Sequence, residues 1–304
     1  MQNTHSVGSL VESTMALIST ARSGRPKLSG TTTGFFDLDQ MIGGFQPGNL
    51  YVVAGRPGIG KTSFALGALL HSAVKKNEPT AIYSSTTDRH SLTRRMLSQM
   101  SGVPLQEIHQ GTLDATQWIA VNHAASTLSS ASINVAESTV FEAFRATQVA
   151  KDSFNERKGL SLLVVDGLRK SSLTLLSPEL PPHEISNDSP VQRSYVQSLL
   201  RELKTIAVVL NCPVVLTWQL GPEIDQRANK LPTISDLHLT EIMEDTIDSV
   251  LLLYRDDLYR TDEEWDGLAE VRVVRNRNGV TGTVRLDFDA GCSCFRTLMP
   301  DQRH

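Results

Sequence analysis

A glycine-rich turn between an apolar strand and a helix constrains this chain more than any other feature. Residues 52–64 read VVAGRPGIGKTSF, and Gly55 to Thr62 satisfy the pattern G-x-x-x-x-G-K-[ST] in full. The glycines let backbone N–H groups face a polyphosphate, and the following helix directs its positive end toward the same place. An ordinary glycine-rich turn is the alternative, but the apolar strand before it and the helical pattern after it favour a nucleotide-binding loop.

The motif assigns chemical roles to its residues. Lys61 reaches the β- and γ-phosphates, and Thr62 supplies a hydroxyl to Mg²⁺. The residues expected to surround the phosphates are Gly55, Arg56, Pro57, Gly58, Ile59, Gly60, Lys61, Thr62 and Ser63. A second apolar run, LSLLVVD, ends in Asp166, which we place beside the metal as the Walker B carboxylate. A nucleotide with Mg²⁺ is therefore the predicted ligand.

Composition and charge are those expected of a soluble globular protein. The chain has 304 residues, of which 40% are hydrophobic and 20% charged, with a formal net charge of −4. That is enough core for one large domain with a small appendage. The first twenty residues contain no lysine, arginine or long apolar run, so we expect a cytoplasmic protein without a secretory signal or membrane span. The slight acidity argues against DNA binding over the whole surface, but it allows a local basic channel.

The cysteines do not indicate a metal site. Cys212, Cys292 and Cys294 are an odd and sparse set that fits a reducing cytosol. Cys292 and Cys294 form C-x-C, but zinc needs four ligands and no second pair or nearby histidine completes them. We interpret both as plain strand residues.

Alternating apolar and amphipathic segments predict a mostly parallel twisted sheet flanked by helices. The expected strands are 50–54, 80–85, 132–135, 160–166, 213–218, 249–254, 269–274 and 282–288. The expected helices are 61–75, 91–100, 115–128, 138–157 and 191–210. Fully apolar strands of this kind are covered on both faces. The last two strands are joined by RNRNGVTG, which predicts a C-terminal hairpin, and the Pro- and Ser-rich stretch 173–190 predicts a long functional loop.

The N-terminal segment differs from the rest. Val11, Met15 and Ile18 recur at helical spacing, and the polar run ARSGRPKLSGTTTG follows them. We expect a short helix and linker over residues 1–30 and one ATPase domain over residues 31–304. So short a helix has no core of its own, and its apolar face packs either on its own domain or on a neighbouring subunit.

One stretch carries a specific resemblance. TGFFDLDQMIGGFQPGNLYVVAGRPGIGKTSFA is similar to the opening of the RecA-like motor domain of DnaB-type replicative DNA helicases. The likeness continues in collinear order over about residues 8–296, through LLVVDGL, NCPVVLTWQL, DQRANKLPTISDL, LLLYRDDLY and VVRNRNGVTGTVRLDF. It implies a RecA-like P-loop NTPase that couples ATP hydrolysis to movement on single-stranded DNA during replication. It also implies a homo-oligomer, in the form of a hexameric ring, whose N-terminal linker helix packs on the adjacent subunit. We expect the family's N-terminal helical domain, which contacts primase, to be absent.

The resemblance assigns further catalytic residues. Gln219 takes the position of the glutamine that senses the γ-phosphate, whereas the simpler interpretation is a surface glutamine at a strand end. Arg275 and Arg277 fall where the family has a lysine and an arginine finger that reach the neighbour's nucleotide. A planar, always-charged guanidinium suits a phosphoryl group whose charge shifts during transfer. The alternative is a solvated hairpin tip rich in arginine.

One catalytic position departs from the family pattern. Family members have a glutamate that polarises the attacking water after the strand that follows the phosphate loop, and alignment of IYSSTTDRHS places Thr86 there. A threonine hydroxyl orients water but cannot accept its proton near neutral pH, and losing a general base costs about 10²–10⁴ in rate. Asp88 would substitute if the strand persisted that far, because it would then face the same way.

The loops expected to contact DNA also depart. Where the family reads Ser-Asp-Leu-Arg-Glu-Ser-Gly, residues 235–241 read SDLHLTE, so His238 replaces an arginine and Glu241 replaces a glycine. The loop after LLVVDGL begins with Arg169 and Lys170 but becomes acidic further on. Single-strand binding needs positive charge and stacking groups.

Two functions therefore compete. The first is a DnaB-like helicase motor that binds single-stranded DNA. The second is an ATP-binding homologue with impaired hydrolysis, which acts in regulation or assembly together with a replicative helicase or its loader. A recombinase or clock-type ring ATPase is a third possibility, and the NRNG hairpin and the linker helix argue against it.

Overall fold

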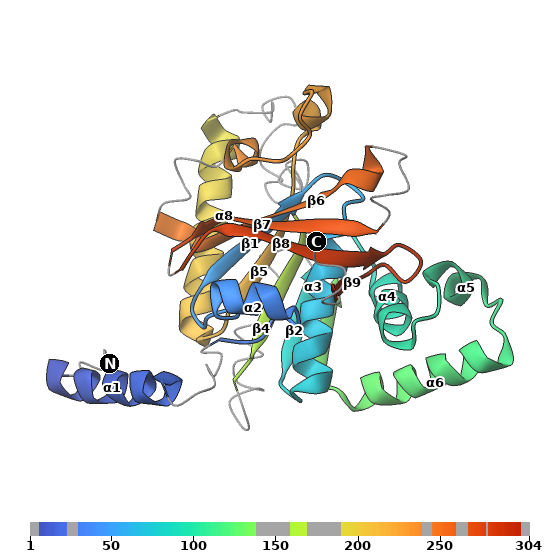
Figure 1. Ribbon diagram of the computed structural model, residues 1–304, viewed down its shortest axis with the longest axis horizontal. Coiled ribbons are helices and arrows are strands. Elements are labelled where there is room, and N and C mark those ends of the chain that lie inside the picture. Colours follow the sequence, from blue (N-terminus) through green and yellow to red (C-terminus); the bar gives the residue numbers. More distant parts are fainter. Residues whose placement is uncertain are drawn as a thin grey trace.

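A nine-stranded sheet forms the centre of the protein (Figure 1). The computed structural model describes residues 6–22, 30–137, 159–168, 190–238, 245–259, 267–277 and 279–298. The strand order is β3-β2-β4-β5-β1-β6-β7-β8-β9. The strands are β1 Leu50–Gly55, β2 Thr80–Ser84, β3 Ile133–Glu137, β4 Leu162–Leu168, β5 Val214–Gln219, β6 Ser249–Arg255, β7 Leu268–Asn276, β8 Gly282–Asp289 and β9 Cys294–Thr297. The strands from β3 to β6 run parallel, and β7, β8 and β9 extend the sheet in antiparallel fashion.

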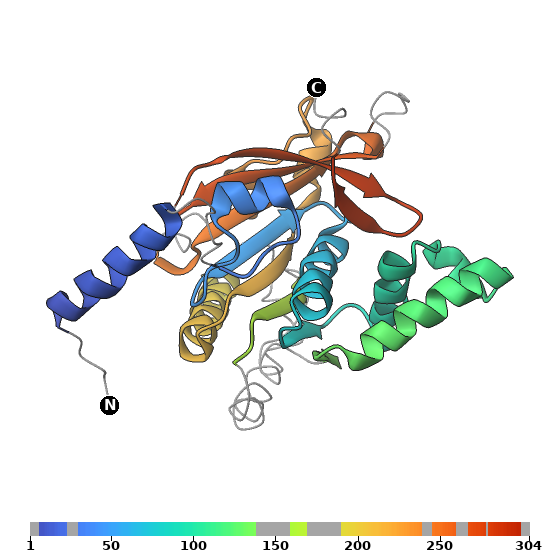
Figure 2. The same cartoon turned by 60° about the horizontal axis from the view of Figure 1, so that its bottom comes forward.

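Helices lie on both sides of the sheet, which confirms the predicted α/β fold with a C-terminal hairpin (Figures 1 and 2). The helices are α1 Val7–Arg22, α2 Phe36–Ile42, α3 Lys61–Leu70, α4 Arg89–Ser101, α5 Leu105–Gln110, α6 Ala115–Ser130 and α8 Pro190–Leu210. A π-helical turn, η1 His71–Lys75, continues α3, and the 3₁₀ turns are η4 Pro222–Gln226, η5 Ile234–Leu237 and η6 Asp256–Leu258.

The central strand β1 separates two apolar cores. Leu50, Val52 and Ala54 belong to the core under α8, whereas Tyr51 and Val53 belong to the core under α2 and α3. All the residues of β1 are buried. A strand covered on both faces reads as a continuous apolar run, which explains why the sequence pattern predicted it well.

Parallel pairing brings the carboxyl ends of four strands to one edge of the sheet. Gly55 at the end of β1 pairs with Gln219 at the end of β5, and Ser84 at the end of β2 pairs with Asp166 in β4. The loops that leave this edge therefore start next to one another, as in other open α/β sheets that bind ligands there.

Several elements differ from the sequence expectations. The helices α2 and α5 and the strand β9 were not anticipated, because segments this short carry little periodic signal. The interpretation of both C-x-C cysteines as strand residues is wrong for Cys292, which lies in the turn before β9, while Cys294 begins that strand. The expected helix 138–157 lies outside the described residues, and so does the expected loop 173–190 except for Pro190.

Helix α1 projects from the sheet domain (Figures 1 and 2). Five of its described apolar side chains are between 48% and 76% exposed, and these are Val7, Leu10, Val11, Met15 and Ile18. These five side chains are therefore not packed on the described part of their own domain, which is one of the two partners that the sequence allowed. Within the part of the chain that the structure describes, no helix has both the length and the apolar character needed to cross a bilayer.

The three cysteines are free and buried, which makes a prediction about their reactivity. Burial raises the pKa of Cys212 to about 12 and, together with the charge of Asp289, raises the pKa of Cys292 to about 11; burial also raises the pKa of Cys294. The nucleophile is the thiolate, so at pH 8 only about one Cys212 side chain in 10⁴ is reactive. Titration with a chromogenic disulfide reagent should show slow reaction in the folded protein and rapid reaction of all three thiols in urea. Rapid labelling of folded Cys212 would contradict its placement.

Candidate functional site

A polar cavity of about 440 Å³ opens at the carboxyl edge of the parallel strands. It lies between the phosphate loop, the carboxyl-terminal parts of β4 and β5 and the residues that follow β2, with the β8–β9 turn on the other side. Its lining residues are Pro57, Gly58, Gly60, Lys61, Thr62, Ser63, Thr86, Thr87, Arg95, Asp166, Gly167, Thr217, Gln219, Phe288 and Ser293. The cavity thus brings together the predicted phosphate loop, Asp166 and Gln219.

The phosphate loop has the backbone that an anion site requires. Gly58 has φ +78° and Gly60 has φ +107°, a left-handed region that favours glycine. A Cβ on Gly60 would also lie 2.9 Å from the ring of Phe295. Helix α3 begins at Lys61 without a side-chain cap, so its first N–H groups and its positive end face the cavity. This arrangement favours a polyphosphate.

Three of the nine predicted loop residues do not line the cavity. The Ile59 side chain is 1% exposed and packs under Gly55, where a Cβ would lie 2.8 Å from Ile59 Cγ2. Arg56 turns away and donates to Leu220 O at 2.9 Å and, through Nε, to Asp225 at 3.0 Å. Its hydrogen bond to Asp225 raises the pKa of Arg56 and lowers the pKa of Asp225. Ile59 and Arg56 therefore support the loop on the side away from the cavity.

Lys61 lies over the loop it belongs to. Its Nζ donates to Gly55 O at 2.9 Å and to Arg56 O at 2.8 Å. The ammonium is thus held at the cavity floor next to the helix N-terminus. A compact charge on a flexible stem can move from these carbonyls to phosphate oxygens.

Asp166 is the centre of a buried hydroxyl network. The carboxylate is 2% exposed, and its Oδ1 accepts from Thr62 Oγ1 at 2.9 Å and from Thr217 Oγ1 at 2.8 Å. Its Oδ2 accepts from Ser84 Oγ at 3.3 Å, and Thr217 Oγ1 accepts from Gly167 N at 2.8 Å. The carboxylate therefore has a fixed orientation toward the Thr62 hydroxyl.

The pair of Thr62 and Asp166 fits a magnesium ion. A hydroxyl and a carboxylate oxygen are hard ligands of the kind that Mg²⁺ prefers, and Mg²⁺ usually keeps waters and phosphate oxygens in its shell. Over the described residues, no group of three or more His, Cys, Asp or Glu side chains could hold a metal alone. A magnesium ion here would therefore depend on a bound nucleotide.

Thr86, which the sequence resemblance aligns with the family's glutamate, lines the cavity. Its side chain packs against Gly167, where a Cβ would approach Thr86 Oγ1 to 2.2 Å, so only glycine fits there. Thr86 N and Thr87 N both donate to Ser84 Oγ, at 3.4 and 3.0 Å. The wall of the cavity on this side therefore consists of hydroxyl groups.

The suggestion that Asp88 replaces the missing carboxylate is wrong. Strand β2 ends at Ser84, so the alternation that would have aimed Asp88 into the cavity does not continue. Asp88 is the N-cap of α4, and its carboxylate accepts from Ser91 N at 2.9 Å. Hydrogen bonding to Ser91 lowers the pKa of Asp88. Aspartate is a preferred N-cap, which is the signal that sequence reasoning missed.

Arg275 and Arg277 lie far from this cavity. Arg275 pairs with Val250 near the start of β6, whereas the phosphate loop is at the opposite edge of the sheet, where the parallel strands end. Strand β7 has nine residues and spans about 30 Å. These arginines therefore do not belong to the cavity of their own chain.

Several lining residues were not anticipated from the sequence. They are Thr87, Arg95, Gly167, Thr217, Phe288 and Ser293, and Ser84 acts from outside the cavity through its hydrogen bond to Asp166. Thr217 did carry a signal, since it is a buried hydroxyl within the apolar strand VVLTWQ. Phe288 did not, because it comes from the far end of the chain; the Arg255 guanidinium lies 3.8 Å above its ring.

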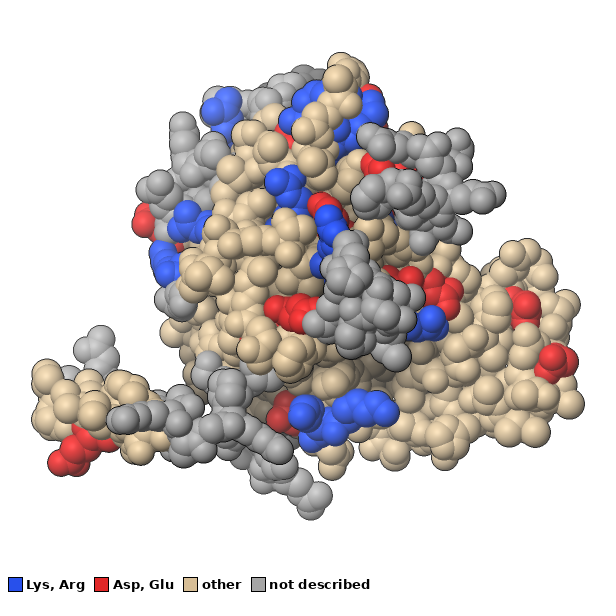
Figure 3. Space-filling model, viewed as in Figure 1, with Lys and Arg blue, Asp and Glu red and all other residues tan. Residues whose placement is uncertain are grey.

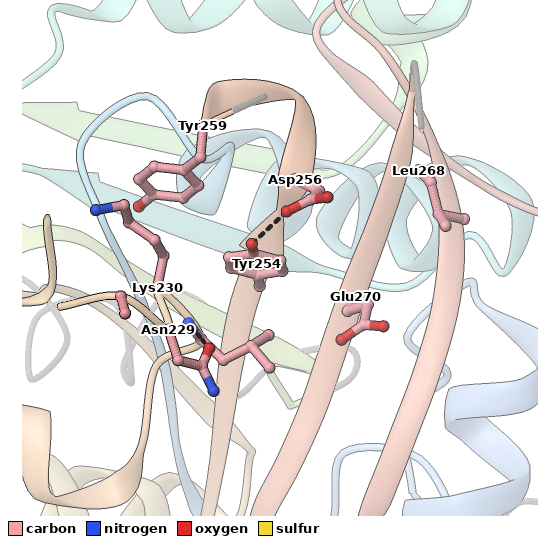
Figure 4. Close-up of a pocket in the computed structure, with 9 residues that line it drawn as sticks. Asn229, Lys230, Tyr254, Asp256, Tyr259, Leu268 and Glu270 are labelled. Carbon is pink, nitrogen blue, oxygen red and sulfur yellow. Dashed lines mark hydrogen bonds between the residues drawn. The ribbon is translucent and has the colours of Figure 1, made fainter. Parts of the chain in front are cut away.

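A second cavity, of about 750 Å³, lies beside the ends of β6 and β7 (Figure 4). Tyr254 and Tyr259 stack there with ring centroids 5.8 Å apart, and Tyr254 donates to Asp256 at 2.5 Å. Asp256 and Glu270 both line it, while the Lys230 ammonium donates to two backbone carbonyls. Two carboxylates would repel a polyphosphate, so the smaller cavity remains the candidate nucleotide site.

Of the residues expected to contact DNA, only part lies in the described chain. Asp236 pairs with Arg227 at 2.9 Å, and Leu237 is buried. His238 ends η5 in the left-handed region with φ +52°. Arg169, Lys170 and Glu241 lie outside the described residues. On the face shown in Figure 3, basic and acidic side chains are interspersed.

Comparison with known proteins agrees with this geometry. The family model described as the DnaB-like helicase C terminal domain matches residues 30–297. The chain belongs to this family. Relatives include the replicative DNA helicase DnaB of Geobacillus stearothermophilus, which is 33% identical over 264 residues, and the replicative DNA helicase DnaC of Bacillus subtilis (strain 168), which is 32% identical over 263 residues. Each alignment covers 86% of this chain and 55% of the relative, so the chain spans about half the length of these helicases.

Solved structures support the same RecA-like ATPase fold. One isolated ATPase domain superposes with a TM-score of 0.81 at 26% identity, covering 97% of this chain and 100% of that one. A DnaB-like replicative helicase, solved in a study of its interactions with primase, gives a TM-score of 0.80 at 25% identity and covers 98% of this chain and 68% of that one. The DnaB-like family and its fold are therefore established for this chain.

The Thr217 hydroxyl makes a prediction about magnesium. Thr217→Val keeps the shape of the side chain but removes the donor that orients Asp166, so the Mg²⁺ affinity of the nucleotide complex should fall about 10- to 100-fold. Affinity for magnesium-free nucleotide should change little. Calorimetric titration of Mg²⁺ at saturating ATP measures the difference.

Thr80→Val is the matched control for this substitution. Thr80 is also a buried threonine of the sheet, and its Oγ1 has no hydrogen-bond partner in the structure. Its replacement should leave the affinity for Mg²⁺ unchanged and should leave the free energy of unfolding unchanged or improved. Equal Mg²⁺ affinities for the two variants would mean that Thr217 does not orient Asp166.

Proposed function

We propose that this chain is the motor domain of a DnaB-type replicative helicase, which binds ATP with Mg²⁺, hydrolyses it and moves along single-stranded DNA in a hexameric ring. The observation that carries the proposal is a single cavity containing the phosphate loop, Asp166 and Gln219, with the two arginines at the opposite edge of the sheet. Family membership and the RecA-like fold support it.

In this proposal each residue of the cavity has one role. Backbone N–H groups of the loop and the N-terminus of α3 hold the phosphates, and Lys61 neutralises the β- and γ-oxygens. Thr62 and Asp166 hold Mg²⁺, which supplies charge neutralisation at the transferred phosphoryl group. Gln219, next to Gly55 in the sheet register, lies where an amide can detect the γ-phosphate and pass its presence to the segment after β5.

The arginines complete the site of another subunit. Since Arg275 and Arg277 lie at the edge opposite their own cavity, they can reach a nucleotide only on a neighbouring copy. Guanidinium groups supplied in this way stabilise the charge that develops during phosphoryl transfer. A head-to-tail contact of this kind forms a ring when its rotation closes, and we propose that it closes with six copies.

Helix α1 suits the same assembly. Its apolar side chains are largely exposed beside the described part of their own domain, and burying them on an adjacent subunit would stabilise the ring. Residues 1–30 then act as the linker helix and linker, and residues 31–304 as the ATPase domain. A helicase loader or a partner helicase would meet this assembly rather than the single chain.

A threonine at position 86 in place of a carboxylate favours the second candidate, an ATP-bound homologue that assembles but hydrolyses slowly. Within the described lining of the cavity, Asp166 is the only carboxylate, and the magnesium role occupies it. Thr86 and Thr87 can orient a water but not accept its proton. A motor with this site would work at a reduced rate, and the two candidates differ in whether DNA still stimulates that rate.

Removing the loop ammonium tests nucleotide binding. Lys61→Ala should weaken ATP binding at least about 100-fold, because the lysine supplies the main point charge on the phosphates. Isothermal calorimetry with ATP and Mg²⁺ measures it, and Lys76→Ala, an exposed lysine outside the cavity, is the control. Retained affinity in Lys61→Ala would contradict the phosphate-loop assignment.

A second experiment separates the two candidates. ATP turnover is measured with and without single-stranded DNA for the unmodified protein and for Thr86→Glu. The motor proposal expects DNA-stimulated turnover in the unmodified protein and a further increase of about 10²-fold or more in Thr86→Glu. Turnover that occurs only in Thr86→Glu would instead support the hydrolysis-impaired homologue.

A further inference from the structure

A β-bulge near the end of β7 decides which face of the sheet carries the two arginines. Leu251 pairs with Val273, but Val250 pairs with Arg275, so Val274 is an extra residue in β7. Directly paired residues of antiparallel strands share a face, and Val250 belongs to the core under α8. The bulge therefore moves Arg275 from the face it would share with Val273 to the α8 face.

Both arginines form hydrogen bonds on that face with the two residues that precede β6. Arg275 Nε donates to Ile247 O at 3.1 Å. Arg277 N donates to Asp248 O at 2.8 Å, and Arg277 Nη1 donates to Asp248 Oδ1 at 3.2 Å. Backbone and side chain of Asp248 thus both contact Arg277.

Asp248 is buried and firmly anchored on its other side. Its side chain is 2% exposed, and Oδ2 accepts from Leu50 N at 2.8 Å and from Lys204 Nζ at 2.6 Å. Lys204 also donates to Gly48 O at 2.8 Å. One oxygen of the carboxylate is therefore attached to β1 and α8, and the other faces Arg277.

We propose that Asp248 is a positioning residue that fixes the Arg277 guanidinium in the orientation needed to reach the nucleotide of the next subunit. This inference rests on the proposed function. Arg277 is 41% exposed, and a long side chain at the end of a strand samples many rotamers unless a partner restricts it. An electrostatic contribution to catalysis requires donors that are already oriented when the charge develops. A guanidinium has five N–H donors, so it can contact Asp248 and a phosphate at the same time.

The kinetic test uses Asp248→Asn, which keeps the shape of the side chain and an acceptor for Leu50 N. We expect kcat for ATP to fall about tenfold or more while KM changes less than twofold, because the variant's own phosphate loop is intact. Lys204→Met is the matched control, since it removes the cation on the other carboxylate oxygen and leaves the Asp248–Arg277 pair. It should lower the thermal stability but change kcat less than twofold. An unchanged kcat in Asp248→Asn, or equal losses of kcat in the two variants, would overturn the positioning role.

Complementation between subunits provides a readout that a simple loss of stability would not change. Lys61→Ala subunits should bind ATP only weakly but carry intact arginines, so in mixed rings they should restore turnover to Asp248→Asn subunits beyond the sum of the two variants alone. Arg277→Ala mixed with Lys61→Ala is the reference. If the reference pair complements and the Asp248→Asn pair does not, the Asp248 proposal fails while the proposed function stands. If Arg277→Ala alone has normal turnover, the proposed function fails instead.

Arg277→Lys keeps the test valid should Asp248→Asn fail to fold. It leaves the buried carboxylate and its anchors untouched and keeps a positive charge for Asp248, but it removes the planar fork that the carboxylate orients. We expect a loss of kcat similar to that of Arg277→Ala. Turnover within twofold of the unmodified protein would show that charge alone suffices and would overturn the positioning role.

Discussion

The parallel pairing of β1 with its neighbours is the constraint on which the rest of the structure depends. In this register Gly55 lies beside Gln219, and β4 places Asp166 beside Ser84. A slip of one residue would turn every side chain of a strand to the opposite face. The Thr217 hydroxyl would then lose Asp166, and the carboxylate would lose its orientation toward Thr62. The apolar residues on both faces of β1 fix the register. The two cores therefore determine where the polar side chains of the cavity lie.

The antiparallel strands bring functional residues to a second end of the sheet, the one where the parallel strands begin. A chain that reverses from β6 into β7 necessarily returns to the edge where the parallel strands begin. Residues at that end of β7 cannot contribute to their own cavity, but they can contribute to that of another copy. The proposed division of the site between two subunits would thus follow from strand topology rather than from any one side chain. The cluster around Asp248 lies at this second edge, where β1, β6, β7 and α8 meet.

The sequence was most informative where function depends on the local backbone. The phosphate loop could be predicted because glycines at set spacing between a strand and a helix determine the conformation, and Asp166 because it ends an apolar run. Features that depend on partners far along the chain could not be predicted in this way. The bulge at Val274 is one, since neither strand reveals its pairing alone, and Phe288 beside the phosphate loop is another. The conditional role of Asp88 fails because strand β2 ends at Ser84, and the capping preference of aspartate already favoured the start of a helix there.

The balance of two catalytic contributions follows from this geometry. A positioned general base is worth about 10²–10⁴ in rate, and Thr86 cannot supply it. An arginine supplied from a neighbour is worth about 10³–10⁵ in related phosphoryl transfers. In the proposed ring the second contribution is present and the first is reduced, so contact between subunits would provide the larger part of the acceleration. Hydrolysis should therefore depend more on ring assembly here than in a protein with a glutamate at this position. The residues that orient the arginines then have more influence on turnover than those that orient the water.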